Sequence, residues 1–294
     1  MSEKSRYVIA PEALKSRLGA AGPKIVDASW YLPAQGRDAH DEYRSAHIPG
    51  AVFFDQDEAV DPASPLPHTL PKPEAFATYA GRLGITERDD IVVYDGLGMF
   101  SAPRVWWLFR VMGVKNVMVL DGGFDNWRRD GFPVTTDIPS PEPATFKPAF
   151  DATAVARRED VMRVIEDGSA QIADARPHGR FTGEDPEPRQ GMRSGHMPGA
   201  FSVPASSLSK DGHLKDLDEL AALLKRAGVD PQKPVITSCG SGVTAAVITL
   251  ALHSLGHEDN RLYDGSWSEW GSRQDTPVNT GEGLIDPASS PSEG

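Results

Sequence analysis

Short apolar runs, rich in β-branched residues, alternate along the first half of the chain with segments whose apolar positions recur at helical spacing. The runs at 24–28, 91–94 and 117–120 have the length and composition of buried strands. Residues 102–112, between the last two runs, are predominantly apolar and form a predicted helix. The alternation of strand, helix and strand favours a parallel sheet with helices on its faces.

The second half of the chain repeats this order. We predict strands over 171–173, 235–237 and 261–263, and a helix over 244–254 that ends before Gly256. The sequence therefore predicts the α/β class, with two domains that each contain a parallel sheet covered by helices on both faces.

Sequence motifs also recur in the same order in the two halves, with an offset of roughly 145 residues. Ser45-Ala-His-Ile-Pro-Gly-Ala51 returns as Ser194-Gly-His-Met-Pro-Gly-Ala200. Ile91-Val-Val-Tyr-Asp95 returns as Val235-Ile-Thr-Ser-Cys239, so that an aspartate in the first copy stands where a cysteine stands in the second. The chain therefore contains an internal duplication.

The duplication sets the predicted domain boundaries, which are 6–134 for the first domain and 154–279 for the second. Residues 135–153 contain prolines at 139, 141, 143 and 148, which favour extended backbone and suit a linker. Residues 280–294 are rich in Gly, Ser, Pro and Glu, and we expect a disordered tail there.

The composition of the 294-residue chain is ordinary for a globular protein, with 39% hydrophobic and 24% charged residues. The formal charge is -12 and no dense Lys/Arg cluster occurs, so we expect no nucleic-acid partner. The longest apolar run, 245–252, is too short to span a bilayer. The first residues lack the apolar stretch of a secretory signal, and we expect a cytoplasmic protein without a membrane partner.

Cys239 is the only cysteine, which excludes an intramolecular disulfide framework and a Cys-rich zinc site. The eight histidines are scattered without ligand spacing, and we expect neither a metal nor a cofactor. A single free cysteine is often a small residue of the core, so its local sequence must decide whether it is reactive.

The cysteine follows a predicted strand directly and opens the loop Cys239-Gly-Ser-Gly-Val-Thr244. In open α/β sheets, ligands bind beyond the carboxyl ends of the strands. Gly240 and Gly242 allow the chain to curl and to turn its amide N–H groups inward, while the next helix directs its positive end at the sulfur. These features favour a thiolate or a persulfide anion over a neutral thiol.

Other interpretations of this loop are a buried structural cysteine, a dinucleotide site and a phosphatase loop. Gly240-Ser-Gly-Val-Thr-Ala245 matches a G-x-G-x-x-A fingerprint, but that motif leaves the cysteine unexplained. A cysteine phosphatase needs an arginine at the end of the loop, where Ala245 stands, and usually has a histidine where Ser238 stands. The phosphatase interpretation is therefore poor.

The loop 239–244 resembles the active loop of the rhodanese family, in particular of those members that use 3-mercaptopyruvate as sulfur donor. The resemblance covers roughly residues 6 to 280 and includes Ser101-Ala-Pro-Arg-Val-Trp-Trp107 and Tyr263-Asp-Gly-Ser-Trp-Ser-Glu-Trp270. It implies two tandem rhodanese-like domains, of which the first is an inactive copy with Asp95 at the cysteine position. It also implies that Cys239 carries sulfur as a persulfide.

The resemblance further implies a set of substrate-binding residues. Arg180 and Arg189, in the Gly/Pro-rich loop 179–189, fall on the family's anion-binding positions, and guanidinium groups bind carboxylates bidentately. The loop amides would hold the persulfide at Gly240, Gly242, Val243 and Thr244. Thiosulfate-type members usually carry Arg and Lys directly after the cysteine; here Gly240 and Ser241 replace them, which favours a donor with one carboxylate.

Segments of the first copy match family segments in which an aspartate and a histidine approach the active loop. Asp57, His68 and Ser241 would then form a proton relay beside the sulfur. His47 and His196 occupy the duplicated His-x-Pro-Gly turns and also occur in the copy without cysteine, so we interpret them as structural.

These inferences predict a sulfurtransferase that moves sulfur from 3-mercaptopyruvate through a Cys239 persulfide to an acceptor, releasing pyruvate. The expected partners are the small-molecule donor and a thiol acceptor, such as thioredoxin or a low-molecular-weight thiol; cyanide is another acceptor. The alternatives are a thiosulfate:cyanide sulfurtransferase, a non-catalytic rhodanese-like binding module and a dinucleotide-dependent oxidoreductase.

Overall fold

The computed structural model describes residues 3–19 and 22–283. The described chain forms two compact units. The N-terminal unit contains Arg6–Ala152 and Ser209–Leu214, and the C-terminal unit contains residues 3–5, 153–208 and 215–283. Most of the predicted disordered tail, residues 284–294, lies outside the described residues.

The N-terminal unit contains a five-stranded parallel sheet with the strand order β1-β5-β4-β2-β3. Its strands are β1 (Val8–Ile9), β2 (Lys24–Asp27), β3 (Val52–Phe53), β4 (Ile91–Tyr94) and β5 (Val117–Leu120). The three predicted strands form the centre of this sheet, and the short edge strands β1 and β3 complete it. All four residues of β4 are buried, as expected of a strand covered on both faces.

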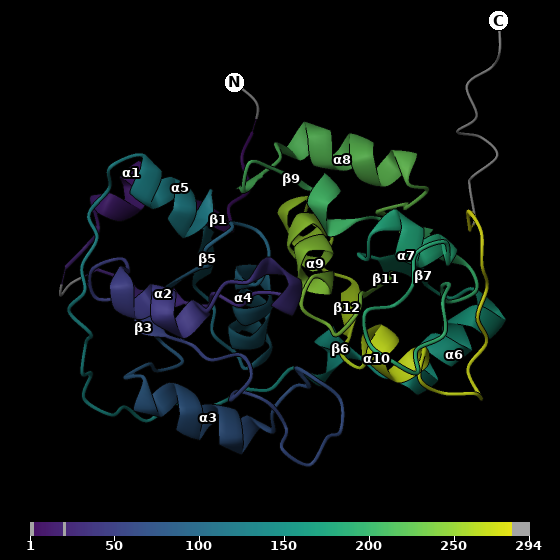
Figure 1. Cartoon of the computed structure of the whole chain (residues 1–294), viewed down its shortest axis with the longest axis horizontal. Helices are drawn as coiled ribbons and strands as arrows, with labels where there is room; N and C mark the ends of the chain where they lie inside the picture. Colours follow the sequence, from purple (N-terminus) through teal and green to yellow (C-terminus); the bar gives the residue numbers. More distant parts are fainter. Residues whose placement is uncertain (1–2, 20–21, 284–294) are drawn as a thin grey trace, which may run out of the picture. The chain divides into compact units, whose positions relative to one another are not determined.

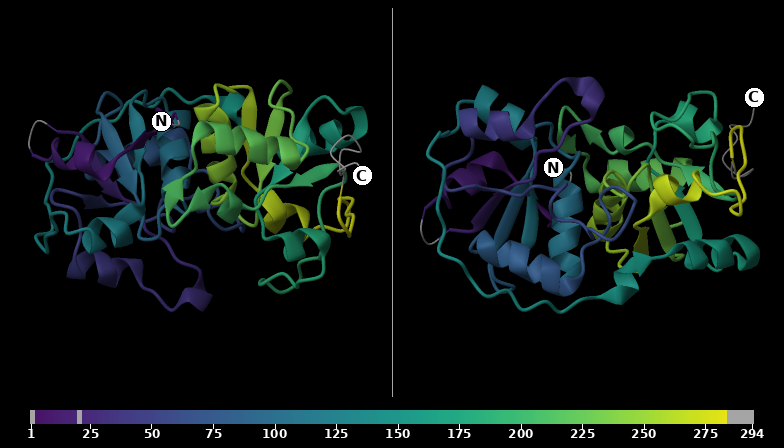
Figure 2. Two further views of the ribbon diagram at one scale, coloured as in Figure 1. Left: turned by 90° about the horizontal axis from the view of Figure 1, so that it is seen from above. Right: turned by 60° about the horizontal axis from the view of Figure 1, so that its bottom comes forward.

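Helices lie on both faces of this sheet (Figures 1 and 2). They are α1 (Pro11–Lys15), α2 (Ala39–Ser45), α3 (Pro73–Arg82), α4 (Ala102–Val111) and α5 (Gly123–Arg129). Leu14 of α1 and Trp127 of α5 belong to one buried cluster with Val92 of β4. Phe76 of α3 packs edge-on against Phe109 of α4, with ring centroids 5.4 Å apart.

The C-terminal unit repeats this topology, with the strand order β6-β12-β11-β7-β8 and parallel pairing throughout. Its strands are β6 (Val155–Ala156), β7 (Gln171–Asp174), β8 (Ala200–Ser202), β11 (Val235–Ser238) and β12 (Asn260–Tyr263). Its helices are α6 (Arg158–Asp167), α7 (His178–Thr182), α8 (Leu217–Arg226), α9 (Ala245–Ser254) and α10 (Ser266–Trp270). The predicted α/β class with two similar parallel sheets is confirmed.

The central strands of the two sheets end at corresponding places. Asp95 follows β4 and precedes the loop to α4, and Cys239 follows β11 and precedes the loop to α9. Residues 245–252 of α9 are all buried, which explains why this run is apolar on every side. In Figure 1, α8 and α9 lie on one side of the C-terminal sheet, and α6 and α10 lie on the other.

A hairpin formed by β9 (Ser209–Lys210) and β10 (His213–Leu214) departs from the sequence prediction. The sequence placed these residues in the second domain, but they pack with the N-terminal unit. The Gly122 amide donates to the Gly212 carbonyl at 3.2 Å, and Asn126 Nδ2 donates to the Asp211 carbonyl at 2.7 Å. Because these two contacts are made by backbone and side-chain amide groups, the pattern of apolar residues did not predict them.

The segment predicted as a linker, 135–153, is extended and packs along the N-terminal unit. The Ala144 amide donates to Gly81 and the Ala149 amide to Met112, each at 2.9 Å. The two histidines of the duplicated turns have matching positions, because His47 forms a bridge with Thr135 and His196 forms one with Asn279. Both imidazoles are buried. In the described part of the chain, no helix is long and apolar enough to cross a membrane.

The strands β2 and β7 both end in a buried aspartate, but the two carboxylates have different surroundings. In the C-terminal unit, Arg176 Nη2 lies 2.7 Å from Asp174 Oδ2. In the N-terminal unit, Ser29 stands at the corresponding position and its amide donates to Asp27 at 2.9 Å. Burial without a cation raises the pKa of Asp27 to about 6, although the hydrogen bonds from Ser29 oppose this rise.

This difference gives a pH-dependent stability. Because the pKa of Asp27 is higher in the folded state than in the unfolded state, its contribution to stability is present at low pH and is lost as pH rises through about 6. Relative to Asp27→Asn, we expect the wild-type free energy of unfolding to fall by roughly 2 kcal/mol from about pH 4.5 to about pH 7.5. Urea unfolding at both pH values measures this, and parallel curves for the two proteins would contradict it.

Candidate active site

Cys239 lies at the carboxyl end of the central strand of the C-terminal unit, and only 2% of its surface is exposed. The Gly242 amide points at Sγ, at a distance of 3.1 Å. The backbone of the cysteine is fixed on both sides, since its amide donates to Ser266 Oγ at 3.2 Å and its carbonyl accepts from the Trp267 amide at 2.9 Å. The start of α10 therefore holds the sulfur in place.

The loop from Cys239 to α9 depends on its second glycine. Gly242 has φ 81°, in the left-handed region that other residues rarely adopt. This conformation turns the Gly242 amide back towards the sulfur. The loop then enters α9 at Ala245, so that the positive end of a helix ten residues long faces the same loop. The arrangement is suited to a negatively charged sulfur.

The corresponding loop of the N-terminal unit shows what such a loop can hold. The Asp95 carboxylate accepts backbone hydrogen bonds from Phe100 at 3.0 Å and from Ser101 and Ala102 at 2.7 Å each. The Gly98 amide donates to its other oxygen. Burial raises the pKa of Asp95 above its ordinary range, although these four amides oppose the rise. A ring of backbone donors thus surrounds a carboxylate at the place that Cys239 occupies in the second copy.

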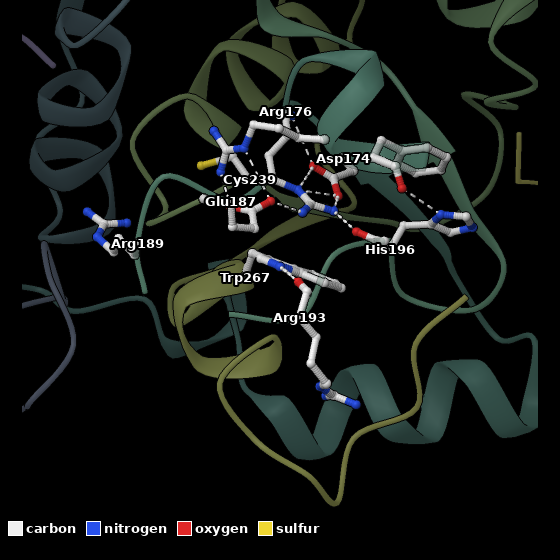
Figure 3. Close-up of polar contacts among 12 residues, drawn as sticks. Asp174, Arg176, Glu187, Arg189, Arg193, His196, Cys239 and Trp267 are labelled. Atoms are coloured by element: carbon white, nitrogen blue, oxygen red, sulfur yellow. Dashed lines mark hydrogen bonds and ion pairs between the residues drawn. The ribbon is translucent and has the colours of Figure 1, made fainter. Parts of the chain in front are cut away.

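A buried ion-pair cluster lies next to the cysteine loop (Figure 3). Arg176 Nη2 binds Asp174 Oδ2 at 2.7 Å, and Nη1 binds Glu187 Oε1 at 2.8 Å. The side chains of these three residues are between 1% and 4% exposed. The guanidinium lies over the Trp267 ring, 4.0 Å from its centroid. Burial lowers the pKa of Arg176, but the two carboxylates outweigh this effect and raise it.

Arg180, a predicted substrate-binding residue, lies directly beside the cysteine loop. A Cβ atom added to Gly240 would stand 3.3 Å from Nη2 of Arg180. The guanidinium also binds Glu187, through Nε at 3.2 Å and through Nη2. Its side chain is 21% exposed, so the group reaches solvent from a partly buried position. The structure therefore places a guanidinium within reach of a ligand on Cys239.

Arg189, the other predicted substrate-binding residue, is exposed and lies apart from the ion-pair cluster (Figure 3). Its link to the cysteine loop is indirect. Arg189 Nη1 donates to Ser268 Oγ at 3.1 Å, and both the amide and the hydroxyl of Ser268 donate to the Gly240 carbonyl, at 2.8 and 2.7 Å. Arg180 is thus close to the loop, whereas Arg189 contacts it through a serine.

Two of the three residues predicted to form a relay are in contact with each other. His68 Nε2 lies 3.1 Å from Asp57 Oδ1, and Trp30 donates to the other oxygen of this carboxylate at 3.1 Å. The hydrogen bond from His68 is the main cause that lowers the pKa of Asp57. His68 is buried and has φ 56°, a strained backbone for a residue with a side chain. The third member, Ser241, lies in the cysteine loop of the other unit.

Sequence reasoning missed Glu187, Arg176 and Ser266 as parts of the site. The segment 179–189, predicted as a loop, begins within α7, and Glu187 stands in the acidic stretch that follows this helix. Its charge did not differ from that of its exposed neighbours. One signal was available for Arg176, because the duplicated segment has Ser29 at the matching position. Ser266 has φ 48° and is completely buried, which the sequence does not indicate.

Comparison with known proteins places both units in one family. The model of the rhodanese-like domain matches residues 10–130 and again residues 158–273. The chain is 47% identical to 3-mercaptopyruvate sulfurtransferase of Escherichia coli K12 over 256 residues, which cover 87% of this chain and 91% of that protein. It is 45% identical to bovine thiosulfate sulfurtransferase over 275 residues, which cover 91% of this chain and 92% of that protein.

The fold is similar to that of a solved structure with the same domain organisation. The crystal structure of SseA from Escherichia coli, described as a 3-mercaptopyruvate sulfurtransferase with the rhodanese fold, superposes with a TM-score of 0.82 at 42% identity. The match covers 89% of this chain and 98% of that structure. The likeness therefore extends over both units.

Proposed function

The chain belongs to the rhodanese family, and from this premise we propose that it is a sulfurtransferase that carries sulfur from 3-mercaptopyruvate on Cys239. The family shows two sulfurtransferase activities in the names of its relatives, one for 3-mercaptopyruvate and one for thiosulfate. A non-catalytic binding module and a dinucleotide oxidoreductase do not account for the reactive position of the cysteine.

The proposal rests on one observation. Cys239 occupies the position that Asp95 occupies in the first copy, where backbone amides surround the carboxylate. The carboxylate oxygens of aspartate are two bonds from Cβ, as is the outer sulfur of a cysteine persulfide. In the loop of the first copy, a carboxylate that extends equally far from Cβ therefore accepts hydrogen bonds from the backbone. We expect the amides of Gly242, Val243 and Thr244 to hold the outer sulfur of the persulfide in this way.

In the first half of the reaction, the Cys239 thiolate attacks the sulfur atom of 3-mercaptopyruvate. The new S–S bond forms as the carbon–sulfur bond breaks, and the electron pair of that bond stays on carbon as an enolate. The proton of the donor thiol balances this charge when the carbon is protonated. The products are the Cys239 persulfide anion and pyruvate.

In the second half, an acceptor thiolate attacks the outer sulfur and takes it as a persulfide, and Cys239 leaves as a thiolate. Cyanide would take the same sulfur as thiocyanate. Thioredoxin or a low-molecular-weight thiol fits the acceptor role, because each supplies a nucleophilic thiolate. Neither half needs an external oxidant or reductant, because the donor carbon takes the electron pair in the first half and the sulfane sulfur keeps its oxidation level in the second.

Arg180 is suited to bind the donor carboxylate and the polarised ketone oxygen, because it lies beside Gly240. Arg189 would contribute from the rim, through its contact with Ser268. Asp57 and His68 form a hydrogen-bonded pair, and their part in a proton relay with Ser241 stays a prediction.

Thiosulfate is the second candidate donor, since a bovine relative of similar identity bears that name. A compact dianion calls for cations close to the sulfur. Gly240 and Ser241 supply none, and the guanidinium of Arg180 is already paired with Glu187. The charges around the loop therefore favour the monocarboxylate donor.

The nucleophile is tested by Cys239→Ser. We expect this variant to lose sulfur transfer from either donor, because a serine hydroxyl cannot form a persulfide, while Tm changes by less than about 3 °C. Transfer to cyanide, followed as thiocyanate, and thermal unfolding measure the two properties. Turnover that persists in the folded variant would remove Cys239 from the reaction.

The arginines are tested by Arg180→Ala and Arg189→Ala. We expect Arg180→Ala to lower kcat/KM for 3-mercaptopyruvate about 10- to 100-fold, because a charge-assisted hydrogen bond to the donor is lost. We expect Arg189→Ala to lower kcat/KM by a smaller factor, because Arg189 is exposed. Arg163→Ala provides a control, since its side chain is 63% exposed on α6. Donor kinetics of Arg180→Ala equal to those of the control would exclude Arg180 from donor binding.

A further inference from the structure

The ion-pair cluster at the cysteine loop is balanced in charge. It contains two guanidinium groups, Arg176 and Arg180, and two carboxylates, Asp174 and Glu187. The Arg176 guanidinium is fully engaged, because Nε and Nη2 bind Asp174, Nη2 also binds the Gly195 carbonyl and Nη1 binds Glu187. Arg176 is therefore a fixed structural cation, and Arg180 is the cation that faces the loop.

Glu187 connects these two arginines. Its Oε1 accepts from Arg176 Nη1 at 2.8 Å and from Arg180 Nε at 3.2 Å, and its Oε2 accepts from Arg180 Nη2. Glu187 thus holds one edge of the Arg180 guanidinium. Within residues 3–19 and 22–283, Nη1 of Arg180 forms no hydrogen bond. The other edge of Arg180 remains for a ligand.

The inactive copy has a similar arginine with a different balance. A Cβ atom added to Gly96 would stand 3.2 Å from Nη2 of Arg37, as the one on Gly240 would from Arg180. Two carboxylates bind Arg37, with Glu42 and Asp125 each receiving hydrogen bonds from two of its nitrogens. Every nitrogen of Arg37 is thereby used. The arginine beside the loop is thus bound by one carboxylate in the C-terminal copy and by two in the N-terminal copy.

We propose that Glu187 determines donor selectivity, by holding Arg180 in place and by cancelling one positive charge, so that a monocarboxylate is preferred to a dianion. This inference rests on the proposed function, because it concerns the choice between 3-mercaptopyruvate and thiosulfate. Glu187 is a positioning residue in this role and acts on the donor through Arg180.

The physical reason is the weak screening of the Glu187 charge. Its side chain is 4% exposed, and charges removed from water interact more strongly and over longer distances than surface charges. Removing this negative charge makes the site more positive. The electrostatic energy of a bound dianion then improves about twice as much as that of a bound monoanion. The removal also loosens Arg180, which weakens the bidentate grip on a carboxylate. Both effects favour thiosulfate relative to 3-mercaptopyruvate.

The test compares kcat/KM for the two donors, with cyanide as the common acceptor, in the full-length wild type and three variants. Glu187→Gln removes the charge and keeps the shape. We expect it to raise the ratio of thiosulfate to 3-mercaptopyruvate at least about tenfold, with a smaller rise at high salt. Glu187→Asp keeps the charge and shortens the reach, so KM for 3-mercaptopyruvate should rise, and the donor ratio with it, by no more than about threefold.

Glu42→Gln is the matched control. It adds the same unit of charge to the chain and removes a carboxylate from the corresponding arginine of the inactive copy. We expect it to leave the donor ratio unchanged. A shift as large as that of Glu187→Gln would show that net charge alone sets the preference and would overturn the role of Glu187.

Two further results would overturn the inference. One is a folded Glu187→Gln variant, checked by thermal unfolding, whose donor ratio equals that of wild type or whose activity falls equally for both donors. The other, decisive even if Glu187→Gln does not fold, is a Glu187→Asp variant that changes the ratio tenfold although its charge is kept. Failure of the proposed function is distinct, because the wild type itself would then not use 3-mercaptopyruvate.

Discussion

The stabilisation of one negative charge by backbone amides, at the carboxyl end of a buried central strand, is the interaction on which the site depends. The parallel sheet brings the strand end to this place, the left-handed Gly242 turns its amide towards the sulfur, and α9 adds its positive end. Asp95 shows the same device with a carboxylate bound to four amides. Both copies therefore keep a loop with inward-facing amides at this strand end, with Asp95 in one loop and Cys239 in the other.

The two copies differ mainly in how their buried charges are balanced. At the end of β7, Asp174 is neutralised by Arg176, whereas Asp27 at the end of β2 accepts hydrogen bonds from Ser29 and Tyr94. At the loop, Arg180 has one carboxylate partner and Arg37 has two. In the N-terminal copy the loop is filled by its own aspartate and the arginine is saturated. In the C-terminal copy, the loop 239–244 has no carboxylate of its own, and Nη1 of Arg180 forms no hydrogen bond within the described residues.

The sequence was sufficient for the features that depend on local pattern. Short apolar runs, and the turn residues that end them, predict the buried strands β4 and β11, the apolar helix α9 and the position of Cys239. Arg180 was found through resemblance, and its neighbour Glu187 was not, because an acidic residue in a polar loop gives no sign that it will be buried between two arginines. The packing of the hairpin 209–214 with the N-terminal unit was not predicted for a similar reason, since backbone contacts such as Gly122 to Gly212 have no sequence pattern.

Persulfide formation on Cys239 can be measured by the intact mass of the wild-type protein after incubation with 3-mercaptopyruvate and removal of the excess donor. We expect a gain of one sulfur atom, located on Cys239 by peptide mapping and lost again when cyanide is added. Unchanged mass under these conditions, or a sulfur atom located on a residue other than Cys239, would contradict it.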